Sequence, residues 1–169
     1  MEIQLICIGK TDDSEIQKLI SNYESRLKHY LKFTLQVIPD LKDAKNLSQE
    51  QQKAKEAILI EKQLSTSDVV ILLDEHGKEF SSVGFSEFLN KKMSSGCKRL
   101  VFIIGGPYGF ADSLHQQYKA KISLSQMTFS HQMIRLFFVE QLYRANTILK
   151  NEPYPVSYTH LTLPTTPYV

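Results

Sequence analysis

The residues VFIIGGPYG (101–109), KISLSQMTFSHQ (121–132) and NEPY (151–154) decide the fold of this chain. An apolar strand predicted at 99–105 runs into a glycine turn, and a second short strand, KISLS (121–125), runs into a polar loop without charged residues. That loop leads into a long apolar helix predicted at 131–149. Two strand ends with flexible backbone, beside a helix that carries ionisable groups, predict a ligand site for which the rest of the chain is the scaffold.

Strands alternate with helices through the remaining sequence. We expect further strands at 2–9, 33–40 and 68–74, and helices at 12–31, at 48–64, from the HGKEFSS turn (76–82) to 93, and at 111–118. This alternation favours one α/β domain with a parallel, doubly wound sheet over residues 1–154. In the helix at 48–64, the expected inward-facing residues include Ala54, Ala57, Ile58 and Ile60.

The composition is typical of a globular domain, with 42% hydrophobic and 22% charged residues in 169. No apolar run approaches the ~20 residues of a membrane span, and the start MEIQLICIGK lacks the features of a signal peptide. We therefore expect a cytoplasmic protein. Cys7 and Cys97 lie far apart and outside any metal-ligand spacing, which predicts free thiols, no metal site and a core position for Cys7.

The formal net charge of +2 is too small to bring the whole protein onto bare nucleic acid. Basic residues do cluster at Lys28, His29 and Lys32, and again at 91–99 (Lys91, Lys92, Lys98 and Arg99). Taken alone, each cluster is best interpreted as a solvated face. An RNA partner would require more than charge, either a dimer that pools two patches or a shaped, protein-containing target.

The composition changes after Tyr154. The segment PVSYTHLTLPTTPYV (155–169) contains no Asp, Glu, Lys or Arg and shows neither a helical nor a strand period. Such a segment buries too little apolar surface to order itself, so we expect a mobile tail outside the domain. It is interpreted as non-native sequence translated past the true end of the reading frame, and a natural disordered tail is the alternative.

In open α/β sheets, ligands bind outside the carboxyl ends of the strands, which here are Leu73–Asp74, Gly105–Gly106 and 124–129. GGPYG is not a phosphate loop, because no Gly-Lys-Ser/Thr follows and Pro107 removes a backbone donor. A purely structural turn is the alternative interpretation. The loop SLSQMTFS suits a planar base held by main-chain hydrogen bonds and by Met127 and Phe129, unless these side chains plug the core.

On the last helix, Ser130 is the expected N-cap. His131 and Arg135 lie one turn apart on one side, and Glu140 and Arg144 lie one turn apart on roughly the opposite side. One side therefore looks into a site, and the other forms an ion pair or a subunit contact. The alternatives are a helix-start histidine without a chemical role and an ordinary surface pair.

No Ser-His-Asp set, paired-carboxylate hydrolase or zinc constellation occurs in this sequence, and on a strand end the side chains of Asp74 and Glu75 are expected to diverge. A reaction driven by binding and orienting a reactive cofactor fits best.

The strings IIGGPYG (103–109), LSQMTFSHQMIRLFFVEQLYRA (124–145) and NEPY (151–154) resemble the ribosomal large-subunit pseudouridine methyltransferase H family of the SPOUT superfamily. The likeness covers residues 1–154. It implies a C-terminal trefoil knot and a homodimer. It also implies methyl transfer from S-adenosylmethionine to N3 of a pseudouridine in 23S rRNA, on the assembled ribosome and without a metal.

The resemblance also implies site residues. Its cofactor positions match Leu73, Gly105, Gly106, Leu124, Ser125, Gln126, Met127, Thr128 and Phe129. The catalytic candidates are His131, Arg135, Arg144 and Tyr154. We expect Gly105→Val to block cofactor binding because the new side chain would enter the ligand space.

The sequence departs from the family pattern after Tyr154, where Pro155 stands in place of a histidine. This predicts cofactor binding with reduced or lost methyl transfer. The departure makes a ribosome-associated cofactor-binding module with impaired catalysis one alternative to an active methyltransferase. A flavodoxin-like nucleotide binder without a knot is a separate alternative.

Overall fold

The computed structural model describes residues 1–153, which form one five-stranded, all-parallel sheet in the order β2-β1-β4-β3-β5. The strands are β1 (Glu2–Ile8), β2 (Lys32–Ile38), β3 (Val69–Glu79), β4 (Arg99–Ile104) and β5 (Lys121–Ser123). The predicted parallel α/β class is confirmed. A flavodoxin-like sheet has the order 2-1-3-4-5, so the flavodoxin-like alternative is wrong.

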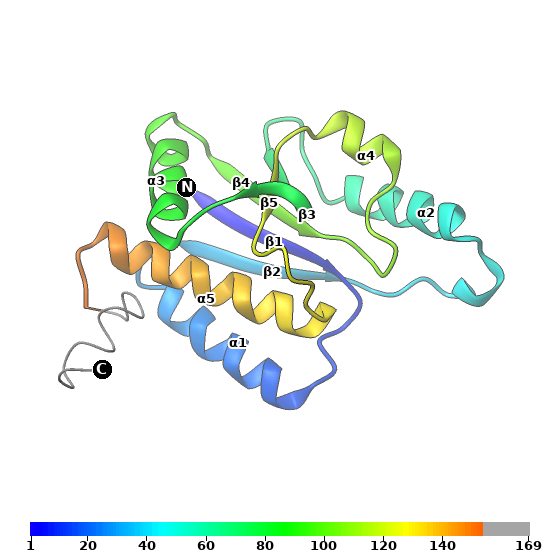
Figure 1. Ribbon diagram of the computed structural model, residues 1–169, viewed down its shortest axis with the longest axis horizontal. Helices are drawn as coiled ribbons and strands as arrows, with labels where there is room; N and C mark the ends of the chain where they lie inside the picture. The colour runs from blue at the N-terminus through cyan, green and yellow to red at the C-terminus, as the bar shows by residue number, and fades with distance from the viewer. Residues whose placement is uncertain (154–169) are drawn as a thin grey trace.

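Helices cover both faces of the sheet (Figure 1). Helices α1 (Ser14–Leu27), α3 (Ser82–Ser94) and α5 (His131–Leu149) lie on one face, with α5 packed against both of the others. Helices α2 (Gln49–Glu61) and α4 (Asp112–Gln117) lie on the opposite face. Among residues 1–153, no helix has both the length and the apolar character that a membrane crossing requires.

The central strands are buried on both sides, which explains why their sequences are nearly continuous apolar runs. On the α5 face, the ring of Phe102 lies 4.7 Å from that of Phe138, and Phe85 packs edge-on against both. Burying each such side chain stabilises the fold by roughly 1.5–3 kcal/mol. Cys7 lies in the same core, as predicted, and burial raises the pKa of its thiol to about 12.

Hydrogen bonds at the helix starts explain where the helices begin. Ser48 and Gln51 form the predicted capping box of α2, and Ser130 caps α5 by accepting from the Met133 N–H. Helix α1 is capped by Asp13, one residue later than expected. It ends at Leu27 instead of Leu31, because residues 28–31 form a turn that leads into β2.

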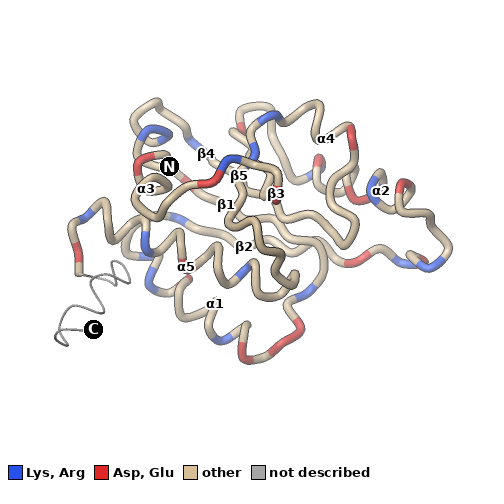
Figure 2. The backbone as a smooth tube through the Cα atoms, in the orientation of Figure 1, with Lys and Arg blue, Asp and Glu red and all other residues tan. Residues whose placement is uncertain are grey.

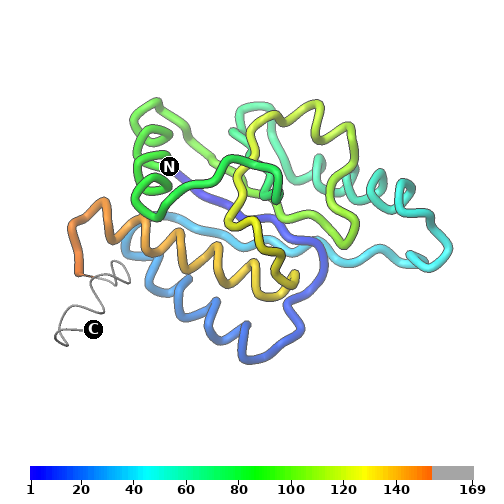
Figure 3. The backbone as a smooth tube through the Cα atoms, viewed as in Figure 1, coloured from blue at the N-terminus to red at the C-terminus, as the bar shows by residue number. Residues whose placement is uncertain are grey.

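The HGKEFSS segment differs from its prediction, because β3 continues through Glu79 before the turn begins. At an irregularity in the ladder, Ile122 of β5 pairs with Leu73 and again with Lys78. A Cβ on Gly77 would lie only 2.6 Å from the Ile122 nitrogen, so glycine allows the two backbones to cross at this point. Figure 3 shows the outer part of β3 passing over the chain at β5.

Helix α2 turns a different face inward from the one predicted. Ala57 and Ile60 are buried as expected, but Ala54 and Ile58 are exposed and Glu56 is buried in their place. Hydrophobic spacing alone therefore assigned Ile58 to the wrong side.

Candidate functional site

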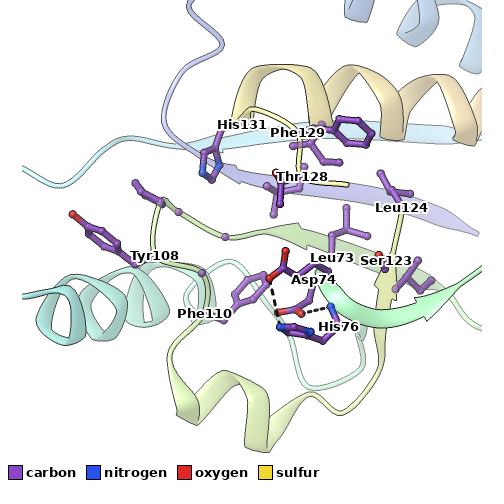
Figure 4. A pocket seen from close by; sticks show the side chains of 18 of the residues that line it. Leu73, Asp74, His76, Tyr108, Phe110, Ser123, Leu124, Thr128, Phe129 and His131 are labelled. Atoms are coloured by element: carbon purple, nitrogen blue, oxygen red, sulfur yellow. Dashed lines mark hydrogen bonds and ion pairs between the residues drawn. The ribbon is translucent and has the colours of Figure 1, made fainter. Parts of the chain in front are cut away.

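A cavity of about 560 Å³ opens at the carboxyl ends of β4 and β5 and beside residues 73–76 of β3, where the β3–β4 ladder ends (Figure 4). Residues 73–76, the turn 104–110 and the segment 122–129 form most of its wall, and the first turn of α5 closes one side. Further lining side chains come from α2 and α4, namely Lys53, Asp112 and His115. This is the edge of a parallel sheet at which ligands bind in α/β proteins.

Most of the residues expected to hold a cofactor line this one cavity. Eight of the nine do so: Leu73, Gly105, Gly106, Leu124, Ser125, Met127, Thr128 and Phe129. Gln126 is the exception, because its side-chain amide turns away and donates a hydrogen bond to Glu79 Oε1 at 3.1 Å.

The glycine turn folds back on itself. Gly106 and Gly109 form a short antiparallel bridge, with the Gly109 N–H donating to the Gly106 carbonyl at 3.0 Å. A Cβ on Gly105 would lie 3.2 Å from the carbonyl carbon and oxygen of Gly109 and 3.3 Å from the Phe110 ring. A side chain at position 105 would therefore first meet the atoms of the turn. The expectation that Gly105→Val acts by entering the ligand space is corrected in this respect.

The buried side chain of Glu56 lies against Gly106 of the same turn. Glu56 is 4% exposed, and a Cβ on Gly106 would lie 2.5 Å from both of its carboxylate oxygens. Burial raises the pKa of Glu56, a hydrogen bond from Gln52 opposes that rise, and the charge of Asp40 adds to it. Sequence analysis missed Glu56, because hydrophobic periodicity predicted that Ile58 would face inward instead.

The segment after β5 is held by its own serines. The Ser123 hydroxyl donates to the Ser125 carbonyl at 2.9 Å, and the Ser125 hydroxyl accepts from the Met127 N–H at 2.9 Å. Met127 is 76% exposed, so the alternative in which it plugs the core is wrong. Phe129 is 40% exposed and packs on Phe137, with ring centroids 4.7 Å apart. The loop thus offers apolar surface at the cavity.

Acidic side chains line the β3 end of the cavity. Asp74 Oδ1 accepts from the His76 N–H at 2.8 Å, and Glu75 lies 3.5 Å from His76 Nε2. Together with Asp112, these carboxylates favour a ligand that carries positive charge. His76, Tyr108 and Phe110 also line the cavity. His76 lies two residues after Asp74, and Tyr108 and Phe110 lie in and just after the GGPYG turn, so their closeness to predicted site segments was the signal that could have found them.

His131, the first residue of α5, lies exposed at the rim of the cavity. Partial removal of its ring from water lowers the pKa of His131, and the positive charge of Arg135 lowers it further. The imidazole is therefore neutral at pH 7 and able to accept a proton.

Arg135 points away from the cavity. It is 1% exposed, and its Nη1 donates to the Gly9 carbonyl at 2.8 Å and to Thr11 Oγ1 at 3.0 Å, while Nη2 donates to the Ile8 carbonyl at 2.8 Å. Only His131 of the predicted pair lines the cavity, because the longer arginine side chain reaches the end of β1.

Gln132 of α5 also bonds to the segment that follows β1. Gln132 Oε1 accepts from the Asp12 N–H at 2.8 Å, and Gln132 Nε2 donates to the Lys10 carbonyl at 3.1 Å. Residues 8–12 are thereby fastened to the first turns of α5, which carry His131.

The predicted Glu140–Arg144 ion pair is confirmed, with a distance of 2.7 Å. Both side chains are 18% exposed, so it is partly buried and differs from an ordinary surface pair. Neither residue lines the cavity. Tyr154 and the tail at 155–169 lie outside the described residues.

Comparison with known proteins agrees with this geometry. The family model described as "Predicted SPOUT methyltransferase" matches residues 1–155. Two proteins named "Ribosomal RNA large subunit methyltransferase H" are similar to this chain over 154 residues, which is 91% of this chain and 98% of theirs. The one from Christiangramia forsetii is 60% identical, and the one from Flavobacterium johnsoniae is 62% identical.

A solved structure of a probable methylase family protein from Haemophilus influenzae Rd KW20 is a more distant match, with 14% identity and a TM-score of 0.49 over 92% of this chain and 71% of that one. The family model and the two closely similar relatives show that this chain belongs to the SPOUT methyltransferases, in the group named ribosomal RNA large subunit methyltransferase H.

Proposed function

We propose that this protein transfers a methyl group from S-adenosylmethionine to a base of large-subunit ribosomal RNA. The observation that carries the proposal is the single cavity at three strand ends, which collects eight of the nine expected cofactor residues. The names of the relatives support the same reaction. In its full form, the proposal is methylation of N3 of a pseudouridine in 23S rRNA, on the assembled ribosome in the cytoplasm.

The residues of the cavity fit this cofactor. Its volume of about 560 Å³ suits a small-molecule site, since such sites measure roughly 300–1,000 Å³. The turn at 105–109 has no phosphate-loop lysine, and the cofactor has no phosphate. Asp74, Glu75 and Asp112 suit a cation, while Met127 and Phe129 suit an adenine ring. When bound, S-adenosylmethionine supplies an electrophilic methyl group on a positively charged sulfur.

The acceptor nitrogen of the base must lose a proton as it gains the methyl group. His131 is the residue we assign to accept that proton, because it stands at the rim with a lowered pKa. The exposed ring of Tyr108, at the outer tip of the glycine turn, suits stacking against the acceptor base. We assign Arg135 a positioning role, since it and Gln132 fasten residues 8–12 beneath His131.

The family resemblance adds a homodimer and catalytic roles for Arg144 and Tyr154 to the proposal. Arg144 does not line the cavity of its own chain, so we propose that it reaches substrate across the dimer. We include no metal in the reaction. Sedimentation equilibrium of the purified protein tests the dimer, and a monomer at micromolar concentration would contradict it.

We also propose the trefoil knot and a single domain of residues 1–154. The close crossing of Gly77 over Ile122 supports the knot, because it brings the outer part of β3 across the chain that leads into α5. An experimental structure in which residues 124–149 do not pass through the loop of the preceding segment would contradict it.

Two measurements test the reaction. Calorimetry should show one molecule of S-adenosylmethionine bound per chain, and labelled cofactor should transfer its methyl group to the large-subunit rRNA of ribosomes from a strain that lacks the modification. His131→Asn should lower kcat by about 10²–10⁴-fold with cofactor affinity retained. Absence of cofactor binding would sink the proposal, and an unchanged kcat would remove His131 from it.

The cofactor-binding module with impaired catalysis is the second candidate, and the close similarity to the named methyltransferases does not favour it. Its remaining support is Pro155, where the family pattern has a histidine. A variant in which one histidine replaces residues 155–169 should methylate ribosomes faster than the chain as given. Equal rates would remove this candidate.

A further inference from the structure

A second large hollow, of about 920 Å³, lies between α3, the outer part of β3 and the start of β5. Seven charged residues line it: Lys78, Lys91, Lys92, Lys119, Lys121, Glu79 and Glu87. We call this hollow the lysine groove. Its five lysines and two glutamates leave three positive charges, which exceeds the formal net charge of +2 of the whole chain. Figure 2 shows these basic segments together at the β5 edge of the sheet.

The lysines of the groove are available to a partner. Within residues 1–153, none of the five forms an ion pair with a carboxylate, whereas Lys53 pairs with Glu50 at 2.9 Å and Lys32 with Glu2 at 3.7 Å. Lys78, Lys91 and Lys119 are exposed. The groove therefore keeps an excess of positive charge after Glu79 and Glu87 are counted, and within the described residues none of its lysines is held in an ion pair.

Aromatic rings hold two of these ammonium groups along the groove. Lys78 Nζ lies 5.0 Å from the centroid of Phe80, and Lys92 Nζ lies 5.4 Å from that of Phe88. The two rings pack edge-to-face with centroids 5.5 Å apart. Cation–π contacts orient an ammonium group without cancelling its charge, so these lysines are ordered before any partner arrives.

The groove lies next to the cofactor cavity. Both are lined by Ile122, and a smaller hollow connects them, sharing Phe80 and Ser81 with the groove and Leu124 and Phe129 with the cavity. A chain-like ligand that places one unit in the cavity can therefore extend around β5 onto the lysines.

We propose that the lysine groove binds the sugar-phosphate backbone of the rRNA strand that carries the target base. Lysines drawn from three separate segments of the chain, at 78, 91–92 and 119–121, match a row of phosphates better than one small anion. The proposal rests on the proposed function and adds to it the surface that brings the RNA to the cavity. It also explains how a chain of net charge +2 engages RNA without general affinity for nucleic acid.

A matched pair of triple variants tests this assignment. In the groove variant, Lys91→Gln, Lys92→Gln and Lys119→Gln remove three charges, and in the control variant Lys42→Gln, Lys45→Gln and Lys62→Gln remove three exposed charges at or near the ends of α2. The groove variant should raise KM for large ribosomal subunits about tenfold or more with kcat retained. Its slope of log affinity against log salt should fall by about 2–3. Cofactor affinity and Tm should match the wild type.

Equal KM values for the two triple variants would overturn the groove assignment while leaving the proposed function intact. A wild-type chain that binds S-adenosylmethionine but methylates no RNA would overturn both, so the two failures are distinguishable. A photo-crosslinking amino acid in place of Lys119 identifies what the groove contacts on ribosomes. Cross-links to large-subunit rRNA support the proposal, and cross-links only to a ribosomal protein would replace it with an acidic protein partner.

Discussion

Two neighbouring regions at the carboxyl edge of the sheet differ in whether side chains cover the strand ends. At the end of β1, the buried Arg135 guanidinium donates hydrogen bonds to the Ile8 and Gly9 carbonyls and covers this strand end. At the ends of β3, β4 and β5, the chain departs in glycine- and serine-rich turns and leaves a cavity of about 560 Å³. The same strand direction thus gives a sealed end and an open end.

Helix α5 produces this difference. Its first two turns carry Arg135 into the β1 end and hold His131 at the rim of the open end. One helix therefore covers the strand end at β1 and supplies a side chain to the cavity at the other strand ends. The strand ends alone do not decide where a ligand binds in this fold, because the side chain inserted between them does.

The largest expected effect comes from breaking the sealed end. Arg135→Met leaves the Ile8 and Gly9 carbonyls buried without their donors, at about 1–3 kcal/mol for each. We expect the free energy of unfolding in urea to fall by about 2–5 kcal/mol. Lys150→Met, at an exposed position after the same helix, should change it by less than about 0.5 kcal/mol. Matching midpoints for the two variants would show that the seal is not a source of stability.

The next effect comes from overfilling the crossing beside the open end. Gly77→Ala puts a Cβ 2.6 Å from backbone atoms of Ile122, which must move, so we expect a loss of about 1–3 kcal/mol. Gly84→Ala in α3 is the control, since its nearest neighbours are the Ser81 hydroxyl at 3.2 Å and the movable Phe80 ring. Thermal unfolding of both variants measures the contrast. A Gly77 variant as stable as the Gly84 variant would mean that the two backbones separate easily.

A smaller change sharpens the role of the open end. Gly105→Ala forces the 109–110 part of the turn to yield by a few tenths of an ångström, because its Cβ would lie 3.2–3.3 Å from Gly109 and Phe110. A strain of about 1 kcal/mol corresponds to roughly fivefold weaker binding of S-adenosylmethionine in calorimetry. Unchanged affinity would separate the shape of this turn from cofactor binding.

The smallest effect links the two ends through charge. NMR titration should give His131 a pKa below the usual 6.5, and Arg135→Met should move it upward only in part, since burial is the larger cause. Because the folded state resists protonation of His131, stability should decline as pH falls below 6.5, and His131→Gln should reduce this decline. A His131 that titrates at or above 6.5 in the wild type would contradict the assignment.

The parallel α/β architecture could be predicted from the sequence, because buried parallel strands and amphipathic helices have strong hydrophobic patterns. Helix α5 begins and ends where the apolar pattern and Ser130 predicted. It could not be predicted that His131 lines the cavity while Arg135 reaches the end of β1. Their spacing places both on one side of the helix, and only the position of β1 separates them. Glu56 was hidden for a related reason, because apolar periodicity gave no cause to turn a charged residue toward a glycine turn.

The buried thiol of Cys7 can report on the opening of strand β1, which lies between β2 and β4 in the sheet. With a pKa raised to about 12 and no exposed surface, Cys7 cannot react with alkylating reagents until β1 leaves the sheet. Cys97, which is partly exposed, offers an internal reference in the same molecule. The labelling rate of one cysteine relative to the other therefore follows the opening of the molecule around β1 without any added probe.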